Sequence, residues 1–160
     1  MPVAASSGGQ ADLAARAVTG PFHDLSAAQA AGYSVEVADL AGLTCIADPT
    51  GMGSIGIHYL DPTLLHGSVS ATTPEVLVSA PGPNGQMRLD ALEYLVPKAN
   101  WDAARGGLDA APPSLSGQEF MLTLAGNRYG LPDFYSLRAW IWDPNPNGMF
   151  AMWNPRVTYP

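Results

Sequence analysis

The sequence predicts an α+β fold: a mostly antiparallel sheet of about six strands, with one or two N-terminal helices and long ordered loops. Helical patterning is confined to residues 11–31. Short β-prone runs separated by Pro, Gly and Asn follow it. Most spacers between these runs are too short for the helical crossovers that parallel strands need, so antiparallel pairing is expected.

Two helices are predicted near the start of the chain. Residues 11–19 are rich in alanine and are followed by a Gly-Pro stop signal, which predicts a short first helix. Residues 24–31 form a clearer pattern, because Asp24 or Ser26 can cap the N-terminus and Gly32 can take the position after the last turn.

Six runs have the composition of strands: residues 43–47, 55–60, 75–80, 87–96, 120–125 and 134–142. The Pro-, Gly- and Asn-containing segment 81–85 predicts a tight turn, so the third and fourth runs are expected to form an antiparallel hairpin. Residues 101–117 and 144–155 are rich in Gly, Pro, Asn and Asp, which predicts ordered irregular loops that cover the sheet.

Length and charge narrow the class of protein. With 160 residues, 47% hydrophobic and 13% charged, the chain is expected to form one globular domain over residues 21–160, preceded by a partly ordered segment or short helix at 1–20. The net charge is -7, and the seven Lys and Arg are scattered, which argues against nucleic acid as a partner. No run approaches the ~20 apolar residues that cross a bilayer, so we expect a soluble protein without membrane contact.

The compartment and the oligomeric state stay open. The N-terminus has no basic region followed by an apolar stretch, so it is not a signal peptide as it stands. Both a cytoplasmic protein and a mature secreted form fit the sequence, and a homodimer is compatible with it. The one cysteine, Cys45, cannot form an internal disulfide and is expected to be a buried small apolar residue.

Glu93 is the first candidate for chemistry. Strict alternation along the fourth run would place Leu89, Ala91, Glu93 and Leu95 on one face of the strand, with Asp90, Leu92, Tyr94 and Val96 on the other. Both faces are largely apolar, and an unpaired buried carboxylate would be costly. Glu93 is therefore expected to be either paired or catalytic.

Arg138 has the opposite charge in a similar setting. Alternation along the last run would place it on one face with Phe134, Ser136, Trp140 and Trp142. A guanidinium among aromatic rings can stack on them and can grip a carboxylate with two hydrogen bonds. Two roles for Arg138 are therefore open: an internal salt bridge with Glu93, or a clamp that holds a ligand.

His58 lies after three glycines, Gly51, Gly53 and Gly56, whose spacing indicates a bulge or a close approach of a ligand. Alone it would be a hydrogen-bonded structural residue, whereas beside Glu93 it would be an acid/base or metal-binding group. The glycines match G-x-G-x-x-G but precede a strand, so a dinucleotide site is not predicted. The other two histidines, His23 and His66, are expected on the surface.

Six aromatic residues are candidate walls of a substrate pocket around these groups: Tyr59, Tyr135, Trp140, Trp142, Phe150 and Trp153. The last four lie in the densest aromatic region of the chain, where flat rings could enclose a small molecule. A hydrophobic lid that closes the sheet is the simpler alternative for the same residues.

Three blocks of the sequence together resemble an uncharacterised family of small, often secreted microbial proteins. They are the segment from Gly53 through Ile57-His58-Tyr59, the segment Glu93-Tyr94-Leu95-Val96-Pro97, and the segment from Trp140 through Asn145-Pro146-Asn147-Gly148-Met149-Phe150 to Trp153-Asn154-Pro155. The resemblance covers roughly residues 24–157 and implies no particular activity. The sequence departs from the family pattern in two places. Members often have His at the position of Arg138, and they often have a second Cys near the C-terminus, whereas this chain has only Cys45.

These observations leave three functions open. The first is a small-molecule enzyme without a cofactor, of isomerase, lyase or cyclase type, that uses His58, Glu93 and Arg138 as catalytic groups. The second is a non-catalytic binding or structural protein in which the same residues form a buried polar network. The third is a metal-binding protein, which Arg138 opposes because it cannot be a ligand and would repel a cation. We expect no bound metal and no cofactor.

Overall fold

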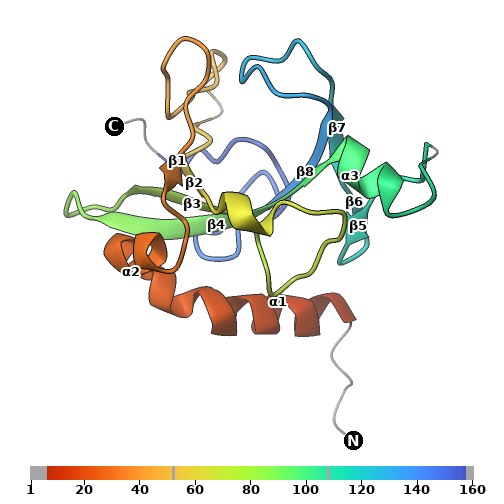
Figure 1. The fold of residues 1–160 in the computed structure, drawn as a ribbon. Coiled ribbons are helices and arrows are strands. Elements are labelled where there is room, and N and C mark those ends of the chain that lie inside the picture. The colour runs from red at the N-terminus through yellow and green to blue at the C-terminus, as the bar shows by residue number, and fades with distance from the viewer. Residues whose placement is uncertain (1–6, 52, 108, 158–160) are drawn as a thin grey trace, which may run out of the picture.

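The computed structural model describes residues 7–51, 53–107 and 109–157, and it confirms the predicted α+β class (Figure 1). The helices are α1 (Ser7–Thr19), α2 (Leu25–Ala30) and α3 (Lys98–Ala103), with short 3-10 turns η1 (Gly20–His23) and η2 (Pro62–Leu64). The strands are β1 (Val35–Glu36), β2 (Ile57–Leu60), β3 (Val76–Pro81), β4 (Met87–Pro97), β5 (Ser114–Leu115), β6 (Gln118–Glu119), β7 (Met121–Thr123) and β8 (Phe134–Ala139).

Both N-terminal helices are present where the sequence predicts them. The first, α1, ends at Thr19, directly before the Gly-Pro signal. The second, α2, begins after Asp24, whose side chain accepts hydrogen bonds from the backbone N–H groups of Ser26 and Ala27. Gly32 follows with φ +121°, a conformation that L side chains rarely adopt.

One antiparallel sheet organises the domain, with strand order β1-β2-β3-β4-β8-β7, while β5 and β6 form a separate hairpin. The expected hairpin of β3 and β4 is confirmed, and its turn is closed by a 2.7 Å hydrogen bond from Gly82 N to Gln86 O. Five of the six predicted runs coincide with strands β2, β3, β4, β7 and β8.

The prediction of a strand at residues 43–47 is wrong. The segment is irregular, and only Ala47 makes an isolated bridge, to Ser54. The Asp39 side chain accepts hydrogen bonds from the N–H groups of Ala41 and Leu43, which turns the chain just before this segment. Local side-chain bonding therefore overrides the β propensity of the run.

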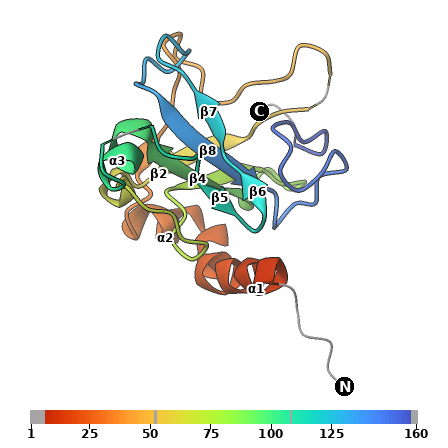
Figure 2. The ribbon, with the colours of Figure 1, turned by 90° about the vertical axis from the view of Figure 1, so that its right-hand side faces the viewer.

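Different segments of the chain pack on the two faces of the sheet. On the helix side, the main core joins Leu92, Tyr94 and Leu137 of the sheet to α1, α2 and α3. On the loop side, a smaller apolar cluster contains Val78, Ala91 and Trp140 together with Val157. The long β1–β2 connection lies away from α1 and α2 (Figures 1 and 2), whereas the C-terminal loop runs from Trp142 and Phe150 on the helix side to Val157 on the loop side. An isolated bridge between Ser54 and Asn154 joins these two segments.

A β-bulge in β4 corrects the predicted alternation. Val78 pairs with Ala91 but the next residue, Ser79, pairs with Leu89, so Asp90 is the extra residue of the bulge. Leu89 therefore joins the core on the helix side instead of sharing the face of Ala91 and Glu93. Strict period-two reasoning cannot anticipate one inserted residue.

The last strand is also shorter than predicted. β8 ends at Ala139, after which Trp142 N–H donates to Asp90 O and the chain leaves the sheet. Trp142 consequently lies on the helix side, where its Nε1 donates to Thr19 Oγ1 at 3.1 Å and Arg16 stacks over its ring. The predicted shared face of Arg138 and Trp142 is therefore wrong.

The two predicted loops have different outcomes. Residues 144–155 are irregular, as expected. The segment 101–117 instead contains the second half of α3 and the start of the β5–β6 hairpin. The helix has six residues and its N-cap, Pro97, provides no side-chain cap, so it lacks the usual sequence signals.

Candidate functional site

Three polar side chains converge on the loop side of the sheet. His58 Nε2 lies 2.8 Å from Glu93 Oε2, and Arg138 Nη2 lies 2.7 Å from the same His58 nitrogen and 3.2 Å from Glu93 Oε2. The prediction that these residues meet is confirmed by these distances. We call His58, Glu93 and Arg138 the polar cluster.

The sheet register explains the convergence. Glu93 of β4 and Arg138 of β8 are direct cross-strand partners. His58 belongs to β2 and pairs with Val78 of β3, which lies between β2 and β4. Because residues paired across strands share a face, His58, Glu93 and Arg138 all project to the loop side, and His58 reaches Glu93 across β3.

The position of one proton decides how the polar cluster is bonded. A guanidinium nitrogen only donates and a carboxylate oxygen only accepts, but His58 Nε2 can do either. With its hydrogen, Nε2 donates to Glu93 and Arg138 donates to Glu93 as well. Without it, Nε2 accepts from Arg138 and loses its bond to Glu93. Whether His58 Nε2 carries the hydrogen therefore decides whether Arg138 donates a hydrogen bond to His58.

Glu93 is ionised at neutral pH. Burial alone would raise its pKa, but the positive charge of Arg138 and the contact with His58 outweigh burial and lower it to about 2. A carboxylate with this pKa does not exchange protons near pH 7. It holds its two partners in place and favours a hydrogen on the His58 nitrogen that faces it.

Arg138 connects the sheet to the C-terminal loop. Its Nη1 donates to Met152 O at 2.8 Å, and its guanidinium carbon lies 6.0 Å from the centre of the Trp140 ring. Its Nε is buried and has no hydrogen-bond partner within the described part of the chain. One donor of this guanidinium is therefore unused.

The polar cluster retains a narrow contact with solvent. The side chains of His58, Glu93 and Arg138 are each 11% exposed. Among the described residues, His58 has hydrogen-bond partners only at Nε2, so Nδ1 is the ring nitrogen that remains for a ligand. The arrangement can place a charged donor and a histidine nitrogen beside one small molecule.

Tyr129 is a neighbour that the sequence analysis missed. Burial, followed by the negative charge of Glu93, raises the pKa of Tyr129, so its hydroxyl remains protonated. It belongs to the loop between β7 and β8, where no periodic pattern relates it to the strands. Only the fold brings this hydroxyl close to Glu93.

Of the six aromatic residues predicted to bind substrate, Trp140 lies beside the polar cluster. Tyr59 and Tyr135 belong to the core on the helix side, so they do not share its face. Trp142 and Phe150 also pack on the helix side. Trp153 is half-buried in the C-terminal loop, one residue after Met152. The aromatic residues therefore do not form one common wall.

The glycines before His58 accommodate the chain itself. A Cβ on Gly53, which has φ +100°, would collide with the backbone of Asn154. A Cβ on Gly56, at φ +76°, would lie 2.5 Å from a methyl carbon of Val78. The close approach that the glycine spacing predicts is thus made by the C-terminal loop and by β3, not by a ligand.

The remaining candidates are structural or exposed. Cys45 is buried, as predicted, and its Sγ lies 2.8 Å from Ser54 Oγ. His23 and His66 are both exposed, also as predicted. Within residues 7–51, 53–107 and 109–157, no three His, Cys, Asp or Glu residues are grouped so that they could hold a metal ion. No helix in this part of the chain is long and apolar enough to cross a membrane.

Comparison with known proteins gives no assignment: no protein-family model, no curated protein and no solved structure matches the chain.

Proposed function

We propose that the polar cluster binds a small anionic molecule, a carboxylate or an enolate-forming carbonyl compound, and that His58 moves a proton on it. The observation that carries the proposal is the contact of His58 Nε2, Glu93 Oε2 and Arg138 Nη2 within 3.2 Å of one another. An ionised carboxylate beside a histidine orients the ring and favours the tautomer with hydrogen on the nitrogen that faces the carboxylate.

The nitrogen of His58 that carries the hydrogen determines which ring nitrogen can act as the base. With hydrogen on Nε2, facing Glu93, the lone pair of His58 lies on Nδ1, which accepts a proton from carbon or oxygen of the ligand. The electron pair of the broken C–H bond moves to the carbonyl oxygen, and Arg138 pairs with the resulting enolate charge. Return of the proton to another atom gives an isomerisation, and its transfer from His58 to a departing β-hydroxyl, which leaves as water, gives a dehydration. No redox cofactor is needed for either.

Glu93 has a positioning role in this scheme. Its pKa of about 2 keeps it ionised, so it is neither the acid nor the base. The second candidate function, a purely structural network, is favoured by the bond from Arg138 to Met152 O, which fastens the C-terminal loop. The two candidates differ in whether His58 is needed for chemistry or only for stability.

Hydrogen exchange tests the proposal. The protein is incubated in D₂O with a panel of 2-oxo acids and other carboxylates that carry a C–H next to a carbonyl, and deuterium incorporation is followed by NMR. We expect incorporation into at least one compound, reduced roughly 100-fold or more in His58→Gln. His66→Gln, at an exposed histidine outside the polar cluster, is the matched control and should leave the rate unchanged.

The structural alternative gives a different result. It predicts no incorporation into any compound, no shift of the His58 ring resonances on ligand addition, and a lower melting temperature for His58→Gln. Exchange that persists at the wild-type rate in His58→Gln would also contradict the proposal.

A further inference from the structure

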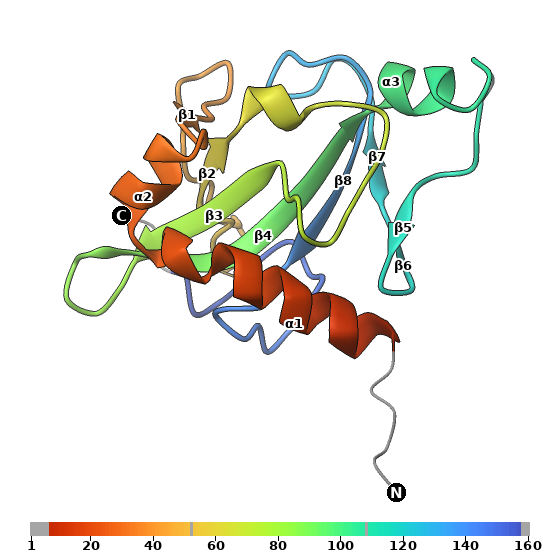
Figure 3. The same cartoon turned by 60° about the horizontal axis from the view of Figure 1, so that its bottom comes forward.

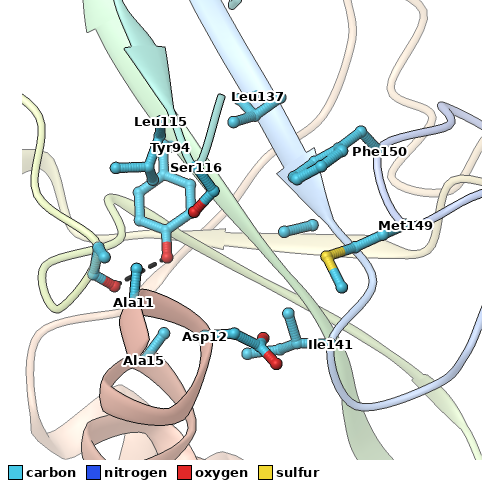
Figure 4. A pocket seen from close by; sticks show the side chains of 12 residues that line it. Ala11, Asp12, Ala15, Tyr94, Leu115, Ser116, Leu137, Ile141, Met149 and Phe150 are labelled. Atoms are coloured by element: carbon cyan, nitrogen blue, oxygen red, sulfur yellow. Dashed lines mark hydrogen bonds between the residues drawn. The ribbon is translucent and has the colours of Figure 1, made fainter. Parts of the chain in front are cut away.

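A cavity on the helix side of the sheet is separate from the polar cluster. It has a volume of about 240 Å³ and lies between α1, β4, β8, the β5–β6 turn and the C-terminal loop (Figure 4). Tyr94 and Leu137 of its lining belong to the helix-side core, whereas Glu93 and Arg138, their chain neighbours, face the loop side. The sheet itself therefore divides the two sites.

Most of the cavity wall is apolar. Leu137, Ile141 and Phe150 line it from β8 and the segment after it, and Ala11 and Ala15 line it from α1. These alanines are one helical turn apart and face the sheet with only a methyl group each, which leaves the space open. A dry apolar cavity of about 150 Å³ in another protein takes up benzene, so this volume suits a substituted single ring.

One charged atom in the cavity has no partner. Asp12 lines the cavity, and its Oδ1 is buried without a hydrogen-bond partner among the described residues, while its Oδ2 is 3.4 Å from Arg16 Nε. Figure 4 shows the Asp12 carboxylate beside Ile141, at the α1 end of the cavity. The nearby Tyr94 hydroxyl already donates to Ala71 O at 2.8 Å. A buried carboxylate oxygen without a donor is costly, and a ligand that supplies one would remove the cost.

We infer that this cavity binds a small arylalkylamine, whose ring fills the apolar space and whose ammonium group donates to Asp12. The apolar wall selects the ring, because burying it removes apolar surface from water. The unpaired carboxylate oxygen selects a cationic donor over a neutral or anionic group. The net charge of -7 also favours the approach of a cation.

The test uses 2-phenylethylamine as the probe, with ethylbenzene and phenylacetate as analogues that lack the donor or reverse the charge. Binding is measured by calorimetry, and the site by NMR shifts of the backbone amides. We expect the amine to bind and to shift residues 11–15 and 137–141. Both analogues should bind at least about tenfold more weakly, as should the amine to Asp12→Asn.

A matched pair of helix variants locates the site. Ala11→Leu fills the cavity and should abolish binding, whereas Ala17→Leu places the same side chain on the exposed face of α1 and should not. Melting temperatures check that both variants are folded. The inference is overturned if the amine does not bind at millimolar concentration, if phenylacetate binds equally well, or if Ala11→Leu binds like wild type. His58 resonances should not move with the amine, so the result is independent of the proposed function.

Discussion

Glu93 and Arg138 are paired twice, once as opposite residues in the ladder of β4 and β8 and once through their side chains, at 3.2 Å. The same guanidinium also holds Met152 O of the C-terminal loop. Loss of the Glu93 charge would therefore weaken both the polar cluster on the sheet and the attachment of the C-terminal loop that covers it.

Glu93→Gln should lower the free energy of unfolding by about 3–5 kcal/mol, because it leaves the buried Arg138 guanidinium without its counterion. The measurement is urea unfolding followed by circular dichroism. Glu36→Gln is the control, since Glu36 is exposed on β1 and should change the value by less than about 0.5 kcal/mol. A loss below 1 kcal/mol in Glu93→Gln would show that solvent already screens the pair.

Glu75 should make stability depend on pH near neutrality. It is 1% exposed, and burial, partly offset by a hydrogen bond from Leu95 N, raises its pKa from 4.5 to about 7. Between these values the folded protein keeps the proton that the unfolded chain releases. Stability from this group is therefore complete below pH 4.5 and falls as the pH rises through 7, by about 3 kcal/mol at most.

Urea unfolding at pH 5 and pH 8 checks this, with Glu75→Gln beside the wild type. The variant should lose less stability over this interval, and the difference between the two proteins isolates Glu75 from Asp90, whose raised pKa acts in the same direction. Glu119→Gln, at an exposed position, should behave like wild type. Equal pH dependence in Glu75→Gln and wild type would contradict the assignment.

Gly53 and Gly51 offer a matched test of how the β1–β2 connection meets the C-terminal loop. Both have positive φ, so alanine at either position costs about 1 kcal/mol of backbone strain. Only at Gly53 would the added Cβ collide with Asn154, so Gly53→Ala should cost at least about 2 kcal/mol more than Gly51→Ala. Thermal unfolding of the two variants provides the comparison, and equal melting temperatures would refute the contact.

The polar cluster should bind no transition metal unless the positively charged Arg138 is replaced. Arg138 lies 2.7 Å from His58 Nε2 and repels a second positive charge there. Arg138→His would give two imidazoles and one carboxylate, a set that binds divalent transition metals. Elemental analysis after dialysis against zinc should find about one zinc per chain in this variant and none in wild type. Arg128→His, at an exposed arginine, is the control; zinc in wild type would contradict the prediction.

The sequence predicted the sheet well because β-prone runs and turn residues act locally. It also predicted the polar cluster, since His58, Glu93 and Arg138 are polar exceptions on apolar strands. It could not predict the bulge at Asp90, where one residue shifts the alternation. Nor could it place Trp142, because period two was extended beyond the true end of β8.

Other features of the sites depend on long-range packing that has no local pattern. Tyr129 feels the charge of Glu93 although it lies in the β7–β8 loop, which is bonded to the β1–β2 connection through Leu40 N–H and Arg128 O. The cavity beside Asp12 arises from α1 crossing the sheet, as Figure 3 shows, and no segment of sequence encodes that crossing.

The separation of His58 and Arg138 along the chain, 80 positions, has a consequence for the order of folding. The β3–β4 hairpin closes through a short turn, whereas the polar cluster requires the ends of a long loop to meet, at a larger cost in chain entropy. Contacts of this kind form late. The core on the helix side depends on contacts of the same kind, since Trp142 Nε1 bonds Thr19 Oγ1 across 123 positions. The hairpin can therefore form first, whereas the core and the polar cluster, which share β2, β4 and β8, are expected to form together.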